Sequence, residues 1–352
     1  MKLSQFNFAL PEELIALRPA RPRDSARLLV IRGAEGRLED LHIRDLPDVL
    51  APNDILVMND TRVIRASLQG SRPARGQGGP IDVDINLNEQ LGPDSWSCFA
   101  RPAKRLREGD VIEFPQGLTG RVTRRAEAEV DLQFNRSGTE LAAAIEKAGQ
   151  MPIPPYIASK RAVDEKDTDD YQTIFAQKSG SVAAPTAGLH FTPRVLEGLS
   201  RRMIDRTSVT LHVNAGTFLP VKSDDISQHL MHSEQAEVSS EAAQKVTAAR
   251  AAGGRCIAVG TTALRTLESA AGEDGTLSAF SASTSIFITP GYRFKVVDGL
   301  LTNFHLPKST LFVLVSAIMG LDVMQRAYAH AIERRYRFFS YGDACLLLPA
   351  GA

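Results

Sequence analysis

Residues 256–271 read CIAVGTTALRTLESAA and carry the clearest architectural signal in the chain. The first four residues form an apolar run typical of a buried strand, Gly260 marks a turn, and a helical pattern follows from Ala263. A strand that passes through a short loop into a helix is the repeating unit of layered α/β domains. The stretch therefore predicts an α/β fold, with this loop at the carboxyl end of a strand, where ligands collect in open α/β sheets.

Segments on both sides of this unit continue the alternation of strands and helices. Apolar and β-branched runs predict strands at 55–58 and 208–213. A helix is expected at 239–252 with Ser240 as its cap, and a later helix is expected to begin with Asp322 as its cap. We therefore expect one sheet covered by helices.

The pattern changes between Ala66 and about Tyr156. Several short segments alternate with period two and are separated by Gly and Pro, as in a small barrel. A single helix at 138–149 closes this section. The predicted strands lie at 81–85, 96–99, 110–114 and 128–134. We expect a layered, mixed-sheet α/β domain formed by residues 1–65 and 156–352, with a small β-barrel domain inserted at 66–155.

Composition excludes several classes of protein. Lys and Arg number 41, as do Asp and Glu, so a polyanion must be met by a local basic patch rather than by a general positive field. Residues 1–7 contain no apolar run of a secretory signal, and the apolar run 311–319 is too short to span a bilayer. Cys98, Cys256 and Cys345 form no CxxC pair. We expect a soluble cytoplasmic protein without a membrane segment, disulfide framework or thiolate zinc site.

Residues 181–192, SVAAPTAGLHFT, are typical of a binding loop. Pro185 removes a backbone donor, and Gly188 permits backbone angles that are closed to its neighbours. The stretch ends at a Thr-Pro pair that predicts a helix start, where free N–H groups attract negative charge. Thr186 and His190 are the candidate binding residues. The alternative is a tight turn whose histidine bonds a buried carbonyl.

A second candidate loop is Gly260-Thr261-Thr262, followed one turn later by Arg265. It offers two hydroxyls, the N–H groups of a helix start and a guanidinium. The alternative is an ordinary Thr-capped helix in which Arg265 pairs with Glu268. The markers of nucleoside triphosphate, dinucleotide and common hydrolase sites, GxxxxGK[ST], GxGxxG, GxSxG and HExxH, are missing.

Three further segments have the same character. Residues 211–218 end a strand in small residues that let a ligand approach the backbone, and residues 302–307 and 338–343 combine aromatic, His or Asp side chains with Gly or Pro. In addition, His229, His232 and Glu234 could hold a metal ion if a further partner joined them. Proton transfer or hydrogen bonding by His232 and Glu234 is the favoured interpretation.

Basic residues gather in three places, at 18–23, 101–107 and 334–337. Each cluster could contact phosphates, and Tyr336 or Phe338 could stack on a base. The alternative for any one cluster is a solvated face paired with nearby carboxylates.

An ordered series of motifs resembles the S-adenosylmethionine:tRNA ribosyltransferase-isomerase family of queuosine biosynthesis, and the match runs nearly end to end. The family usually has Gly where this chain has Asn214 and Arg where it has Leu219, whereas His212, Gly216 and Thr217 are in place. The motifs are MNDTRVI at 58–64, SVAAPTAGLHFT at 181–192, LHVNAGTF at 211–218, MHSE at 231–234, VGTTALRTLES at 259–269, GYRFKVVDGLLTNFHLPKST at 291–310 and YRFFSYGDA at 336–344.

The resemblance implies transfer and isomerisation of the ribosyl moiety of S-adenosylmethionine onto a 7-aminomethyl-7-deazaguanine (preQ1) base at the tRNA anticodon wobble position. Epoxyqueuosine, adenine and methionine are the implied products. The expected co-substrate is S-adenosylmethionine, the expected partner is tRNA carrying preQ1, and no metal is expected. The implied fold, an α/β domain with an inserted β-barrel, agrees with the break at 66–156. The oligomeric state is left open, and a monomer is compatible with the sequence.

The implied chemistry requires groups that move protons. A sulfonium centre acidifies the neighbouring C5′ protons, so a neutral imidazole can remove one, and adenine needs a proton in order to leave. Glu234 or Asp343 would orient an imidazole or face the sulfonium charge. The candidate catalytic residues are His190, His212, His232, Glu234, His305 and Asp343.

The remaining candidates bind the two substrates. The Thr186 and Thr261-Thr262 loops would hold the methionine carboxylate or the ribose hydroxyls at helix starts. The target base would be reached by unstacking it from the anticodon loop. Candidates for S-adenosylmethionine are Pro185, Thr186, Gly188, Gly216, Thr217, Gly260, Thr261, Thr262, Arg265 and Asn303. Candidates for tRNA are Asn59, Asp60, Arg62, Arg101, Lys104, Arg105, Arg335, Tyr336 and Tyr341.

Two other classes of function stay open from the residues. One is a metal-dependent hydrolase built on His229, His232 and Glu234, without an RNA partner. The other is a non-catalytic RNA-binding module, which is disfavoured because the polar loops outnumber what phosphate contact needs.

Overall fold

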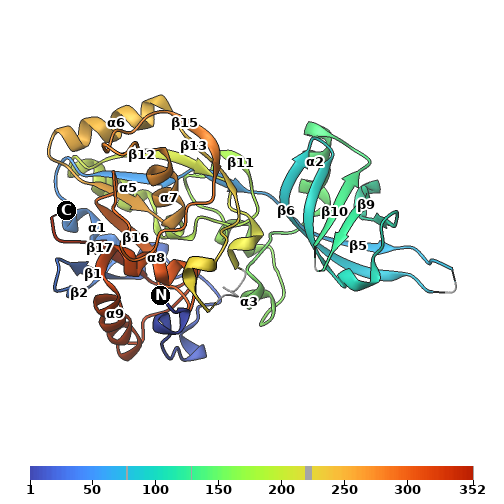
Figure 1. The fold of residues 1–352 in the computed structure, drawn as a ribbon, viewed down its shortest axis with the longest axis horizontal. Coiled ribbons are helices and arrows are strands. Elements are labelled where there is room, and N and C mark those ends of the chain that lie inside the picture. Colours follow the sequence, from blue (N-terminus) through green and yellow to red (C-terminus); the bar gives the residue numbers. More distant parts are fainter. Residues whose placement is uncertain (77, 128, 219–223, 352) are drawn as a thin grey trace.

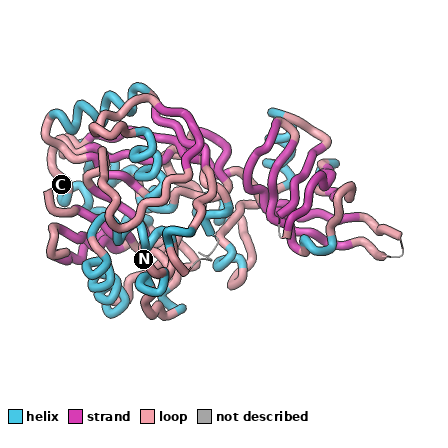
Figure 2. The backbone as a smooth tube through the Cα atoms, in the orientation of Figure 1, coloured by secondary structure: helices cyan, strands magenta, loops and turns pink. Residues whose placement is uncertain are grey.

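The computed structural model describes residues 1–76, 78–127, 129–218 and 224–351. A β-barrel stands out to one side of a larger α/β body (Figure 1). In Figure 2 the barrel consists mainly of strands, whereas helices and strands alternate through the larger body. The predicted fold class, a layered mixed-sheet α/β domain with an inserted small β-barrel, is confirmed.

The α/β body is built on one mixed sheet. Four neighbouring strands, β12, β3, β14 and β16, run parallel to one another, whereas β17 is antiparallel to β16 and β13 is antiparallel to β12. In spatial order the strands are β15 (Phe280–Thr284), β13 (Glu234–Val238), β12 (Asp205–Leu211), β3 (Ile55–Asn59), β14 (Cys256–Val259), β16 (Gly299–Asn303), β17 (Ala344–Leu348), β1 (Arg27–Arg32) and β2 (Arg37–His42).

The central strands are buried along their whole length, because helices cover both faces of the sheet. Helices α6 to α9 pack on the face that carries Val57 and Ala258, whereas α1 and α5 pack on the face that carries Leu56 and Val259. These helices are α1 (Leu46–Val49), α5 (Pro193–Arg201), α6 (Ser240–Ala251), α7 (Thr261–Ala270), α8 (Thr310–Met319) and α9 (Leu321–Glu333). The carboxyl ends of the parallel strands therefore meet at one edge of the sheet.

Two predicted helix caps are wrong by a short distance. The N–H of Ala242, in the first turn of α6, donates to the Ser239 hydroxyl at 3.1 Å. Ser239 rather than Ser240 is therefore the cap. Helix α9 begins after Gly320, which places Asp322 inside the first turn. A carboxylate at that position interacts favourably with the helix dipole without capping the helix.

The barrel is closed, and its strands alternate as predicted. In β6, Val83, Ile85 and Leu87 are buried, whereas Asp82 and Asp84 are exposed. Strands β5 and β9 were not predicted, and residue 128 of the predicted strand 128–134 lies outside the described residues. Around the barrel the strands are β10 (Glu129–Phe134), β7 (Ser95–Arg101), β6 (Ile81–Gly92), β5 (Ser67–Arg72), β8 (Val111–Glu113) and β9 (Thr119–Ala126), followed in the chain by α2 (Gly138–Ala148).

The chain enters and leaves the barrel at adjacent points. Ser67 N–H donates to the Gln150 carbonyl at 3.2 Å, and Gln150 N–H donates to the Ser67 carbonyl at 2.8 Å. Gly149 permits this approach, since a Cβ there would lie 1.9 Å from the Arg65 carbonyl oxygen. The flanking elements are the parallel pair β4 (Thr61–Val63) and β11 (Lys178–Ser181), and the short helices α3 (Pro155–Ala158) and α4 (Lys166–Asp170).

Among the described residues, no single helix is long and apolar enough to cross a membrane. Helices α8 and α9 meet that criterion of length and composition only as a pair, and the pair is bent by 114°.

Candidate active site

A pocket lies at the carboxyl ends of β14 and β16, where the sequence predicts ligand binding. Three loops that are far apart in the sequence meet there, each at the start of a helical turn. The lining residues are Ala184, Pro185, Thr186, Ala187, Val213, Met231, Gly260, Thr261, Thr262, Arg265, Thr302, Asn303, His305, Thr310, Leu311, Phe339 and Ser340.

The start of α7 forms one wall of the pocket. Gly260 has φ +91°, which favours glycine, and no side chain caps the first turn of α7. The first-turn N–H groups of an uncapped helix are available to an acceptor on a ligand. The alternative of a Thr-capped helix is therefore not what the chain adopts.

Arg265 is buried in the same wall and pairs with Glu234. Their side chains are 5% and 4% exposed, Arg265 Nη1 donates to Glu234 Oε2, and Arg265 Nε donates to the Ile286 carbonyl at 3.2 Å. The Nη2 group has no hydrogen-bond partner among the described residues. A buried donor left unpaired costs free energy, which a ligand oxygen reaching it would recover.

Glu268, the alternative partner considered for Arg265, pairs with other residues. Its carboxylate accepts backbone N–H groups from Lys295, Val296 and Val297 at 3.0–3.1 Å and the hydroxyl of Tyr292 at 3.0 Å. Glu268 therefore holds the segment before β16 rather than the pocket.

Two buried asparagines fix the pocket loops. Asn303 accepts the Thr186 hydroxyl at 2.9 Å and donates to the Phe339 carbonyl at 3.1 Å. Asn59, at the end of β3, donates to the Leu211 carbonyl at 2.9 Å and to Thr262 Oγ1 at 3.3 Å. Because their amides are satisfied by the protein, both residues position the site. Asn59 was predicted to contact tRNA, and the structure places it in this internal role.

His305 is the predicted catalytic histidine that lines the pocket. Its ring Nε2 lies 3.0 Å from Thr302 Oγ1, and its backbone N–H donates to the Tyr328 hydroxyl at 3.0 Å. Burial lowers the pKa of His305 to about 3. The imidazole is therefore neutral at ordinary pH, and Nδ1 has no partner among the described residues.

His190 and Asp343 lie outside the pocket lining. The His190 ring nitrogens face the carbonyl oxygens of Ala187 at 3.1 Å and Gly342 at 3.0 Å, and burial lowers the pKa of this ring. Asp343 accepts from both Arg27 and Arg337. The contacts of His190 are those of the alternative considered for it, a histidine that bonds a buried carbonyl, and the contacts of Asp343 hold two arginines.

His212 and His232 flank the pocket without lining it. His212 Nδ1 lies 2.7 Å from Thr61 Oγ1, and burial lowers the pKa of this ring, with the nearby Asp60 carboxylate opposing that effect. His232 is exposed and packs against Gly216, where a Cβ would come within 2.9 Å of the imidazole. The neighbour of His232, Met231, does line the pocket.

Gly188 and Asn214 do not line the pocket. The absent side chain of Gly188 leaves room for Thr173, which a Cβ would approach to 3.1 Å. Asn214 donates its N–H to Glu234 at 3.2 Å. The backbone of Thr217 lies in the turn η8 (Ala215–Phe218), but its side chain and all of Leu219 lie outside the described part of the chain.

Asp60, Arg62 and Tyr341 do not line the pocket either. Asp60 accepts the Thr210 hydroxyl at 2.7 Å, and burial raises its pKa. Arg62 is exposed and donates to Ser179 Oγ at 3.3 Å. Tyr341 is 2% exposed, and its hydroxyl has no partner among the described residues.

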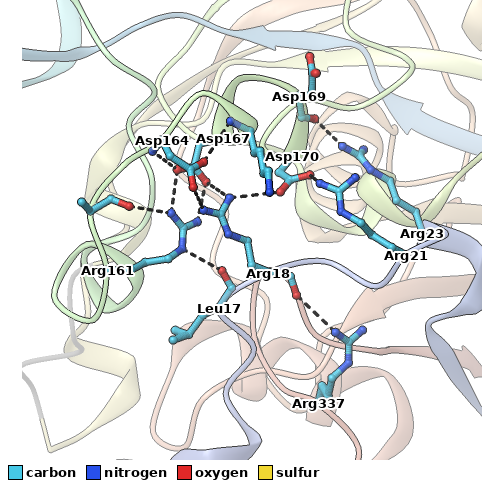
Figure 3. A network of polar contacts seen from close by, with 12 residues as sticks. Leu17, Arg18, Arg21, Arg23, Arg161, Asp164, Asp167, Asp169, Asp170 and Arg337 are labelled. Atoms are coloured by element: carbon cyan, nitrogen blue, oxygen red, sulfur yellow. Dashed lines mark hydrogen bonds and ion pairs between the residues drawn. The ribbon is translucent and has the colours of Figure 1, made fainter.

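The basic cluster at 18–23 is neutralised by carboxylates. Figure 3 shows Arg18, Arg21 and Arg161 converging on the aspartates of α4 and of the residues before it. Asp167 is the centre of this network, since it accepts from Arg161 and Arg18 and from the N–H of Asp164. The cluster is therefore a structural clasp, as the alternative interpretation held.

The cluster at 334–337 offers no stacking surface. The Tyr336 ring is 0% exposed, its hydroxyl donates to Asp40 at 2.6 Å, and the Arg27 guanidinium lies 4.0 Å above it. Phe338 is equally buried. The interpretation of these rings as platforms for a base is wrong, because both belong to the core. Arg335 is exposed.

The barrel cluster is different. Arg101, Lys104 and Arg105 are exposed, and no ion pair joins them to a carboxylate within the described ranges. The cations of this cluster are therefore available to phosphates.

The metal interpretation gains no support. The Glu234 carboxylate is taken by Arg265 and Asn214, and no group of three His, Cys, Asp or Glu is placed to hold a metal ion in the part of the chain that is described.

Sequence reasoning missed nine lining residues: Ala184, Ala187, Val213, Met231, Thr302, Thr310, Leu311, Phe339 and Ser340. All except Leu311 lie inside a quoted motif, but nothing in a motif separates the side chain that faces a cavity from its neighbour that enters the core. Phe338 and Phe339 are the clearest example.

Comparisons with known proteins agree on one family. Residues 3–347 match the family model described as "Queuosine biosynthesis protein". The chain is 60% identical over 350 residues to an S-adenosylmethionine:tRNA ribosyltransferase-isomerase from Maricaulis maris, with 99% of each chain covered, and 56% identical to a protein of the same name from Novosphingobium aromaticivorans, with 99% of this chain and 100% of the relative covered.

A solved structure extends the likeness to three dimensions. The crystal structure of an S-adenosylmethionine tRNA ribosyltransferase from Thermotoga maritima is 33% identical, covers 98% of this chain and 100% of its own, and superposes with a TM-score of 0.56. The chain belongs to the queuosine biosynthesis protein family.

Proposed function

We propose that this protein transfers and isomerises the ribosyl moiety of S-adenosylmethionine onto the preQ1 base at the anticodon wobble position of a tRNA, with release of adenine and methionine. The observation that carries the proposal is the meeting of the uncapped start of α7 with the buried Arg265 in one pocket. Relatives that match the whole chain carry the name of this activity. A reaction on tRNA also fits the cytoplasmic location expected from the sequence.

The pocket suits the polar end of S-adenosylmethionine. The N–H groups at the start of α7 favour an anion, and the Thr262 and Thr186 hydroxyls lie beside them. In this proposal the methionine carboxylate or the ribose hydroxyls are held there, and Arg265 supplies a further charged donor. The φ of +91° at Gly260, which glycine adopts readily, makes the turn from β14 into α7.

His305 is the proposed proton-transfer group. It is neutral and lies in the pocket, so it can accept a proton from C5′, and the resulting imidazolium can return a proton to the leaving adenine. His190, His212 and His232 have their rings outside the pocket lining, and Asp343 is held by two arginines. We therefore assign them to positioning the loops.

Replacement of His305 by Gln should lower adenine release by about 100- to 10,000-fold, because general acid–base catalysis contributes that much. The same change should alter the pH dependence of stability. Between its folded pKa of about 3 and the ordinary value near 6.5, the unfolded state binds the extra proton, so stability is complete above about pH 6.5 and falls towards pH 3. Between these two pH values, the free energy of unfolding of the variant should change with pH by up to about 1.4 kcal/mol per pH unit less than that of the wild type.

Chemical unfolding at several pH values and an adenine assay measure both effects. His330→Gln is the matched control, since its ring is away from the pocket and bonds Asp40. Unchanged turnover in His305→Gln would remove the assignment.

The barrel cluster is proposed to hold the phosphates of the anticodon arm. Reversing the charges of Arg101, Lys104 and Arg105 should reduce the slope of log K against log salt by about 3, because each phosphate contact releases counterions worth about 0.9 of slope. Filter binding over a salt series measures this slope. Reversal of Arg201 and Lys245, exposed cations of α5 and α6, is the control. An unaltered slope in the barrel variant would place this cluster outside the tRNA footprint.

Incubation with S-adenosylmethionine and tRNA carrying preQ1, with detection of free adenine, tests the function itself. Adenine release that depends on both substrates supports the proposal. No release, together with a stoichiometric tightly bound metal ion in the purified protein, would favour the hydrolase built on His229, His232 and Glu234.

A further inference from the structure

Phe339 has a backbone conformation that its side chain disfavours. Its φ is +74°, in the left-handed region that glycine adopts readily and bulky residues avoid. Strained residues of this kind persist where the surroundings force them, and they gather at ligand sites. Glycine would avoid this strain, so the phenylalanine side chain must have a use that glycine lacks.

The surroundings of Phe339 force the conformation through hydrogen bonds. Phe339 N–H donates to the Phe304 carbonyl at 2.9 Å, and its own carbonyl accepts from Asn303 Nδ2 at 3.1 Å and from Gly342 N–H at 2.9 Å. Asn303 is the same side chain that accepts the Thr186 hydroxyl. The turn at 339–342 is thus tied to two other walls of the pocket.

The ring of Phe339 is not part of the hydrophobic core. Phe338 packs among Phe8, Phe304 and Tyr328, whereas Phe339 is half-buried and lines the pocket. The positive φ turns consecutive phenylalanines to different sides, one into the core and one into the pocket. Core packing therefore does not explain why an aromatic residue occupies position 339.

A second ring supports Phe339. The Tyr156 ring lies with its centroid 4.4 Å from that of Phe339 at an interplanar angle of 44°, and the Tyr156 hydroxyl accepts Ser340 N–H at 3.2 Å. Tyr156 comes from α3, on the chain that returns from the barrel. The two rings form an aromatic wall of which only Phe339 lines the pocket, with Tyr156 packed behind it. The other walls of the pocket offer hydroxyls, helix-start N–H groups and Arg265.

We propose that this wall, with Phe339 as its contact surface, is the platform on which the adenine of S-adenosylmethionine stacks. The inference rests on the proposed function and adds the orientation of the ligand: the base lies on Phe339, and the charged methionine end lies towards Arg265 and α7. A stacked base is held through its face, which leaves its ring nitrogens open to the proton that adenine needs in order to leave.

The test compares Phe339→Gly, Phe339→Tyr and wild type in the adenine-release assay at saturating preQ1-tRNA. The KM for S-adenosylmethionine and the Ki of S-adenosylhomocysteine, its uncharged sulfide analogue, should both rise about 5- to 150-fold in Phe339→Gly and stay near wild type in Phe339→Tyr. Thermal unfolding of Phe339→Gly should show an unchanged or higher Tm, because glycine relieves the positive φ. Met203→Gly is the matched control, since Met203 has φ +57° and is 74% exposed.

Three results would overturn the proposal. A rise in KM for S-adenosylmethionine with an unchanged Ki for the sulfide would mean that Phe339 attracts the sulfonium cation instead of the base. Unchanged constants with a lower Tm would mean that the ring serves packing. Absence of adenine release from wild type would remove the proposed function itself, and the adenine platform with it.

Discussion

Replacing Arg265 by Met should destabilise the protein by about 3–5 kcal/mol, because it leaves a charge buried without its partner. Arg265 and Glu234 are 5% and 4% exposed, and without the guanidinium the Glu234 carboxylate keeps only the Asn214 N–H as a donor among the described residues. The kcat/KM for S-adenosylmethionine should also fall about 10- to 100-fold, the usual effect of one hydrogen bond to a charged group. Chemical unfolding and the adenine assay measure the two losses.

A double variant separates the two roles of this pair. Arg265→Met with Glu234→Leu removes both charges, and replacement of a buried pair by apolar residues is often neutral or stabilising. Stability should therefore return while activity stays low. Arg201→Met is the control, since its pair with Glu197 is exposed and should contribute less than about 1 kcal/mol. An active double variant would show that Arg265 serves the fold alone.

Replacing Asp167 by Asn should destabilise the protein by about 1.5–3 kcal/mol, because it weakens the charge-assisted hydrogen bonds from Arg161 and Arg18. Asp167 is 0% exposed and accepts from Arg161 and Arg18 (Figure 3). Burial raises its pKa, but the hydrogen bond and charge of Arg161 and the N–H of Asp164 outweigh that effect and lower it. The contribution is therefore present above about pH 4 and is lost as pH falls below it.

Asp169→Asn is the matched control in the same helix. Its carboxylate is exposed, and Arg23 donates to its backbone carbonyl, which the substitution leaves in place. At pH 7 the unfolding midpoint of Asp167→Asn should lie below that of Asp169→Asn. At pH 3 the two midpoints should be nearly equal. Equal stability of Asp167→Asn and wild type at pH 7 would show that the clasp contributes nothing.

The sequence predicts the sheet and the pocket loops well, because their signals are local. Cys256 to Val259 is an unbroken apolar run, and Gly260 followed by two threonines marks the turn before the helical pattern. The meeting of Thr261 and His305 in one pocket follows from the parallel strands β14 and β16, whose carboxyl ends share an edge. Thr186 follows β11, which belongs to a separate two-stranded sheet, and joins the pocket through its bond to Asn303. Strand β9 was missed because its outward residues, Arg121, Arg124 and Arg125 among them, obscure the apolar alternation.

The roles of single side chains depend on distant neighbours and could not be predicted. A histidine in a Gly/Pro loop has the same sequence whether it lines a pocket, as His305 does, or bonds two carbonyls, as His190 does. The sequence around Arg18 is typical of a phosphate contact, whereas the fold pairs Arg18 with Asp167, which lies 149 residues later in the chain. The positive φ of Phe339 could not be predicted either, because no residue type near it indicates a left-handed conformation.

The paired crossing at Ser67 and Gln150 ties the two connections of the barrel to each other, and Val182 and Ala215 of the α/β body pack against the barrel core. A displacement of one connection is therefore passed to the other. In the proposed function, the position of the barrel cluster relative to the pocket depends on this crossing, which no pocket residue forms. Because a Cβ at position 149 would lie 1.9 Å from the Arg65 carbonyl oxygen, Gly149→Ala would force the two connections apart.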